Sequence, residues 1–163
     1  MIGSLMMCVS AVLLVTGMLA GIAMGIAQNF QLAPAHAHLN LVGGVLLFLF
    51  GLYYRMIPAA GSSRLAQIQG TLHLVGAFVF PAGIALVLLR GASWELAPVT
   101  GALGVTLATI LFAVVVIRTA RAERRAVPAH LAGGPQLASR SQGVHGIVQH
   151  SDSHGASWRQ RPL

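Results

Sequence analysis

The sequence predicts an all-α integral membrane protein, a bundle of four transmembrane helices followed by a flexible tail. Of its 163 residues, 56% are hydrophobic and only 8% are charged, which is too apolar for a soluble domain that must cover its surface with charge. The apolar residues gather in four long runs that carry almost no charge. A transmembrane β-barrel is excluded, because its strands would be short and would alternate between polar and apolar residues.

Each of the four runs has the length of a membrane span. We expect helices over about residues 2–27, 32–57, 65–89 and 96–118, each at or above the ~20 residues that cross a ~30 Å hydrocarbon core. The first run has no basic residue before it and is longer than the apolar part of a signal peptide. We therefore interpret it as a span that is retained.

The prolines agree with these boundaries. Pro34 and Pro98 suit the starts of the second and fourth helices, because the first turn has no use for the missing N–H group. Pro58 suits the end of the second helix. Pro81 falls inside the third helix, where we expect it to kink the helix or loosen its hydrogen bonds.

All ten basic residues are arginines, and their positions predict the orientation. Arg55 and Arg64 flank the second loop, and the fourth helix is followed by Arg118, Arg121, Arg124 and Arg125. The first loop is uncharged, and the third sets Arg90 against Glu95. Because cationic residues stay on the cytoplasmic side, both termini should be cytoplasmic in a bacterial inner (plasma) membrane. The formal charge of +7 is thus a topology signal that favours anionic lipids, and we predict no nucleic-acid binding.

Residues 126–163 differ from the transmembrane domain over residues 1–125. They are rich in Gly, Ser, Gln, His and Arg without apolar periodicity, which predicts a flexible cytoplasmic tail. Imidazoles suit Zn, Cu and Ni, and the tail contains His130, His145, His150 and His154. Ordering a flexible segment around a metal costs entropy, and no cysteine or carboxylate cluster assists it, so we favour a tail without a metal site.

The first predicted helix carries a stripe of glycines. Gly17, Gly21 and Gly25 recur every fourth residue, which is a doubled GxxxG pattern. Such a stripe lets a second backbone approach closely. We therefore expect a helix-packing face there, either within the chain or between copies in a homo-oligomer.

The candidate polar side chains in the predicted second and third spans are His36, His38, Asn40, Gln69 and His73. Ionisable groups at membrane depth are costly and mark candidate functional sites. On a regular helix, residues four apart share a face and residues two apart lie about 200° apart. His36 therefore shares a face with Asn40, whereas His38 points away, so both cannot bind one metal ion. Gln69 lies one turn before His73 and is placed to orient its imidazole.

These histidines have two interpretations. His36, His38 and His73 are candidate ligands of haem or of a metal ion such as Cu or Zn, or each is a neutral histidine paired with a backbone carbonyl. If the two spans are antiparallel and centred in the bilayer, His38 and His73 are offset by roughly 16 Å, so they do not share one flat haem. A second copy of the chain, or a partner subunit, would supply the second ligand.

The run "HLNLVGGVLLFLFGLYYRMIP", His38 to Pro58, resembles the second helix of subunit I of the haem-copper oxidases, and most closely that of the nitric oxide reductase branch. The following "RLAQIQGTLHLVG" resembles the start of the next helix in short relatives of that subunit. The resemblance implies a fragment of the oxidase fold in which His38 is an axial ligand of a low-spin haem b. The helices that supply the copper-binding histidines in the full enzymes have no counterpart here, so it implies no oxygen or nitric oxide reduction.

The sequence thus predicts a haem b or metal-binding accessory protein in electron transfer, haem or metal handling, or sensing, as a homo-oligomer or a subunit of a respiratory complex. The choice between His36 and His38 stays open, because His36 shares its face with Gly43 and Gly51, where a macrocycle has more room. The alternative is a cofactor-free scaffold or assembly protein packed through its glycines. A proton conductor is disfavoured, because no acidic residue lies in a span. We predict no catalytic residues, since no nucleophile–base pair or phosphate loop is present.

Overall fold

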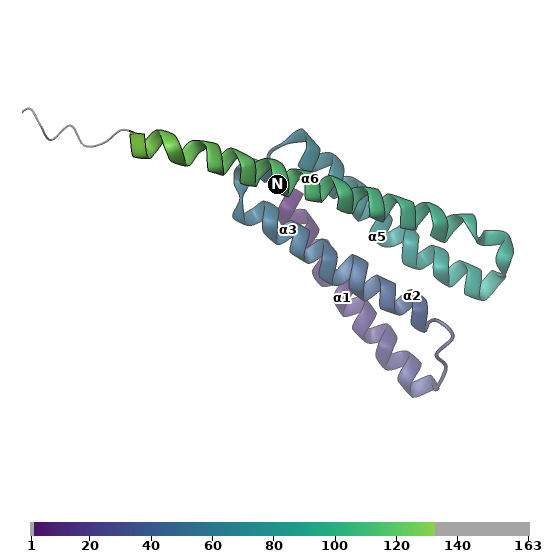
Figure 1. The fold of residues 1–163 in the computed structure, drawn as a ribbon. Coiled ribbons are helices and arrows are strands. Elements are labelled where there is room, and N and C mark those ends of the chain that lie inside the picture. The colour runs from purple at the N-terminus through teal and green to yellow at the C-terminus, as the bar shows by residue number, and fades with distance from the viewer. Residues whose placement is uncertain (1, 133–163) are drawn as a thin grey trace, which may run out of the picture. The chain divides into compact units, whose positions relative to one another are not determined.

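The computed structural model describes residues 2–132, with side chains for residues 2–125, and this part of the chain contains helices and no strand (Figure 1). The elements are α1 (Ile2–Ala27), α2 (Ala33–His38), the π-helical η1 (Leu39–Leu46), α3 (Leu47–Met56), α4 (Pro58–Gly61), α5 (Arg64–Arg90), the short 3-10 helix η2 (Ala92–Trp94) and α6 (Leu96–Ala132). Four helices are long and apolar enough to cross a membrane, with α2, η1 and α3 forming one continuous span. The predicted all-α membrane fold with four spans is confirmed.

The helix boundaries follow from local chemistry. Pro34 lies in the first turn of α2, and Pro58 begins α4. The Ser63 hydroxyl accepts a hydrogen bond from the Ala66 N–H at 3.1 Å and so caps the start of α5. Gly91 ends α5 with φ of 91°, a conformation that glycine adopts without steric cost.

The fourth helix is longer than predicted. It was expected to end near Arg118, where the apolar run stops, but α6 continues to Ala132. The added residues are rich in alanine and arginine, which are strong helix formers and need no apolar environment. Residues 126–132 of the predicted tail are thus helical, and residues 133–163, on which the rest of that prediction falls, lie outside the described part of the chain.

The first span packs against the second along most of its length, and Figure 1 shows α1 running beside α2 and α3. A Cβ atom added at Gly3 would lie 2.7 Å from the Gly51 carbonyl oxygen, and one added at Gly21 would lie 3.0 Å from the His36 ring. At Gly17 the added atom would collide with the Asn40 side chain. The predicted glycine face therefore packs within the chain through Gly17 and Gly21. Gly25 has nothing within 4 Å and takes no part in it.

The third and fourth spans pack by the same device. On α5, a Cβ atom added at Gly76 would lie 2.7 Å from the Val105 side chain, and one added at Gly83 would lie 2.5 Å from the Pro98 nitrogen. On α6, a Cβ atom added at Gly101 would lie 2.6 Å from the Phe80 backbone. The α5 helix continues through Pro81, which cannot donate to the Ala77 carbonyl. Gly43 of the second span approaches that carbonyl, with its added Cβ 3.5 Å from the oxygen.

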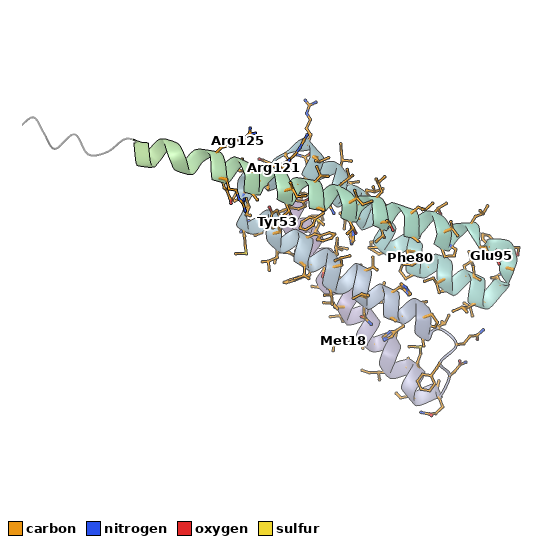
Figure 2. All side chains as sticks on the ribbon, viewed as in Figure 1. Met18, Tyr53, Phe80, Glu95, Arg121 and Arg125 are labelled. Atoms are coloured by element: carbon orange, nitrogen blue, oxygen red, sulfur yellow. The ribbon has the colours of Figure 1, made fainter. Side chains whose placement is uncertain are left out.

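Aromatic side chains connect α6 to the second span. Phe112 of α6 stacks on Phe50 at a centroid distance of 4.0 Å and meets the rings of Tyr53 and Tyr54 edge-on. Figure 2 shows Tyr53 on the side of α3 that is near α6. Phe50 also meets the His73 ring edge-on at 5.0 Å. This aromatic cluster is part of the buried core.

Gly17→Ala and Gly25→Ala form a matched pair that tests this packing. Gly17→Ala should lower the free energy of unfolding by about 1–3 kcal/mol, because overpacking forces α1 away from Asn40. Gly25→Ala should leave stability unchanged or raise it slightly, since alanine favours a helix and the site is open. Thermal unfolding of both variants in one detergent checks this. Equal midpoints for the two variants would contradict the contact at Gly17.

Candidate functional site

A π-helical stretch interrupts the second span at the predicted site. Over η1 the turn widens, and the Leu47 N–H reaches back five residues to the Val42 carbonyl. Gly43 and Gly44 lie at its centre, packed against Leu13 and Leu14 of α1. Such stretches are rare in proteins, and those that occur are frequently found at functional sites. Sequence reasoning missed it, because a helical wheel assumes a constant 3.6 residues per turn.

Two fully buried side chains donate hydrogen bonds to carbonyl groups of this stretch. The Ser10 hydroxyl on α1 donates to the Gly44 oxygen at 2.7 Å, and Nε2–H of His73 on α5 donates to the Val42 oxygen at 3.2 Å. Because a carbonyl only accepts, the His73 proton lies on Nε2 and its Nδ1 carries a lone pair. His73 and Ser10 thus tie two spans to η1. A signal for Ser10 was present, since the small residues Gly3, Ser10 and Gly17 recur every seven residues.

Gln69 is fully buried one turn before His73, but the two side chains do not bond to each other. Its Oε1 accepts a hydrogen bond from the Tyr54 hydroxyl at 2.9 Å, which links α5 to α3. Within the described part of the chain, Gln69 Nε2 and His73 Nδ1 have no hydrogen-bond partner. The predicted orienting bond from Gln69 to His73 is therefore not formed directly. Tyr54, which sequence reasoning did not select, is the partner of Gln69 instead.

His36 and Asn40 face α1. The Asn40 amide nitrogen lies 3.2 Å from His36 Nε2, the His36 ring packs on Gly21 and the Asn40 side chain on Gly17. The shared face predicted for these two residues is confirmed. At Gly43 and Gly51 this side is packed against α1. The space beside His36 itself is not filled, so room for a macrocycle at His36 stays a prediction.

His38 has different surroundings. Its Nδ1 lies 2.7 Å from the Pro34 carbonyl oxygen, so Nδ1–H donates and Nε2 keeps its lone pair. Its ring meets Phe80 of α5 edge-on at 4.7 Å, and the side chain is half-buried. A backbone carbonyl that fixes Nδ1–H is the usual way in which a protein presents Nε2 of a histidine to a metal.

The three histidines of the spans are not brought together. His36 points to α1, His38 lies beside Phe80, and His73 lies beside Val42. Phe80 follows His73 by seven residues, which separates the levels of His38 and His73 by roughly 10 Å along α5. No three His, Cys, Asp or Glu side chains within the described residues could hold a metal ion. A single Cu or Zn site on all three histidines does not fit this arrangement, whereas a haem needs one histidine from each side of the ring.

An apolar cavity of about 520 Å³ lies beside His36, in the size range of small-molecule sites. It is lined by residues of three helices, with Ala20 and Met24 from α1, Ala35 from α2, and Pro81 and Ala85 from α5. The Gln31 side chain donates to the Leu88 carbonyl at 3.0 Å and ties the first loop to α5.

Ser10→Ala tests the tie to η1. It leaves the Gly44 carbonyl without this donor and should lower the free energy of unfolding by about 1 kcal/mol. Thr16→Ala is the control, because the Thr16 hydroxyl is exposed and bonds only to Val12 of its own helix. Unfolding by a denaturing detergent in mixed micelles measures both. Equal losses would show that the Ser10 bond contributes nothing of its own.

Comparisons with known proteins identify no relative. No family model matches the chain, no curated protein matches it, and no solved structure matches it. These comparisons give no support to a relation with the haem-copper oxidases, which stays a prediction from the motifs at His38 to Pro58 and Arg64 to Gly76.

Proposed function

We propose that this chain is a haem b protein of the bacterial inner membrane, with His38 as an axial ligand and electron transfer as its task. The observation that carries the proposal is the 2.7 Å hydrogen bond from His38 Nδ1–H to the Pro34 carbonyl, which leaves Nε2 free to bind iron. The motif that resembles the oxidases selects the same residue. A bound b-type haem would supply reversible one-electron chemistry, tuned by the axial ligand and by burial.

His38 is a better candidate than His36. Both ring nitrogens of His36 lie within 3.4 Å of the Asn40 amide, and its ring is packed on Gly21. Binding iron at His36 would break its contact with the Asn40 amide. His38 can bind iron without losing its hydrogen bond to Pro34.

The second axial ligand comes from outside this chain in our proposal. His73 donates to the Val42 carbonyl, and it lies at a different level from His38. A second copy of the chain, related by a two-fold axis that brings two His38 side chains together, would complete the site. A partner subunit of a respiratory complex would do so equally. The arginine distribution supports cytoplasmic termini in this assembly.

A second candidate function is a cofactor-free scaffold or assembly protein. It is favoured by the use of buried polar side chains in pairing helices, since Ser10, His73 and Tyr54 all bond to neighbouring helices. In this case the role of His38 would be structural, since its hydrogen bond to the Pro34 carbonyl stabilises the first turn of α2.

Absorption spectra of purified protein, oxidised and dithionite-reduced, separate the two functions. We expect a b-type spectrum in the wild type and in His36→Ala, and its loss in His38→Ala, because only His38 presents a free Nε2. The protein should be produced in cells with ample haem and purified in mild detergent.

His73→Phe is the control for a non-specific effect of losing a buried histidine, and it should retain haem. A colourless wild type would contradict haem binding and favour the scaffold. A spectrum that is lost in His36→Ala and kept in His38→Ala would show that His36 is the ligand and would contradict our assignment of His38.

A further inference from the structure

We infer that the core holds one bound water molecule between Gln69 and His73, which accepts a hydrogen bond from Gln69 Nε2 and donates one to His73 Nδ1. Both residues are fully buried, and both atoms lack a partner among the described residues. Buried polar atoms without a partner are costly and therefore rare, above all at membrane depth. The site is independent of haem binding.

The roles of the two atoms are fixed by their neighbours. His73 Nε2–H donates to the Val42 carbonyl, so Nδ1 is an acceptor. The Tyr54 hydroxyl donates to Gln69 Oε1, so the amide presents its N–H₂ donor on the other side. One unpaired donor and one unpaired acceptor thus lie one turn apart on the same face of α5, at the spacing at which side chains are neighbours.

This pair of roles selects the ligand. A cation is excluded by the Gln69 N–H₂ donor, and an anion is excluded by the lone pair of His73 Nδ1. A neutral molecule that donates and accepts at once satisfies both, and a buried water, which typically makes about three hydrogen bonds, is the smallest such molecule. The bond missing between Gln69 and His73 is then supplied through water.

The water completes a chain of hydrogen bonds in which every donor points the same way. The chain runs from Tyr54 through Gln69, the water and His73 to the Val42 carbonyl in η1. Bonds in such a chain polarise and strengthen one another. The amide of Gln69 does not release a proton to the water, so the chain positions η1 and does not conduct protons.

Magnetic resonance of the wild-type protein in lipid bilayers, labelled with 15N-histidine, tests the site directly. We expect His73 to be neutral, with its proton on Nε2, and magnetisation to pass from water protons to Nδ1. His73→Phe removes the signal and so assigns it. Gln69→Met, which keeps the length of the side chain but not its donor, should abolish the transfer. The matched control Gln67→Met, at an exposed position on the same helix, should leave it unchanged.

Two results would overturn the inference. An Nδ1 of His73 that receives no magnetisation from water in the wild type would show that no water is bound. A direct bond from Gln69 Nε2 to His73 Nδ1 would replace the water by the side chain. It would be seen as a scalar coupling between the two nitrogens in wild-type protein labelled with 15N in both glutamine and histidine. Both are measured on the wild type, so the outcome does not depend on Gln69→Met folding.

Discussion

The pairing of the Val42 and Gly44 carbonyls with His73 and Ser10 is the interaction on which the packing of the core depends. The hydrocarbon region offers no water to backbone carbonyls. The Val42 and Gly44 carbonyls keep a bond from the Leu47 N–H within η1, and each accepts a second bond from a neighbouring helix. The wide turn of η1 finds one on each side, in α1 and in α5. The irregular stretch therefore joins three spans that a regular helix would leave to van der Waals contact.

Close contact between backbones also stabilises the packing of the helices. It is needed because lipid tails are as apolar as side chains, so the hydrophobic effect does not drive helices together in a membrane. Gly17 and Gly51 let α1 and the second span approach until side chains or carbonyls meet a backbone, and Gly101 does so between α5 and α6. Phe112 fills the space between α6 and α3 that no glycine closes.

The four spans and the faces of His36 and Asn40 could be predicted from the sequence, since both follow from run length and regular helical spacing. The end of α6 could not, because hydropathy marks where a helix leaves an apolar environment and not where its hydrogen bonds stop. The π-helical turn could not be predicted either, because it changes the helical spacing itself. Its partner Ser10 lies on the regular helix α1, where the seven-residue spacing of Gly3, Ser10 and Gly17 was a signal. Gln69 does not bond directly to His73, and its partner is Tyr54 of α3 instead. The spacing of residues along α5 cannot predict this contact, because it is made with another helix.

The side chains of His36 and His38 are fixed by different contacts, and this difference bears on which of them our proposal selects as the haem ligand. His36 depends on Asn40 and on the approach of α1, which are contacts between elements. His38 takes its anchor from the Pro34 carbonyl, one turn earlier in its own helix. A ligand anchored locally keeps its tautomer and direction when neighbouring helices are lost or exchanged. In our proposal His38 is therefore the axial ligand, because its hydrogen bond to Pro34 fixes its tautomer, and a second copy of the chain or a partner subunit supplies the other ligand.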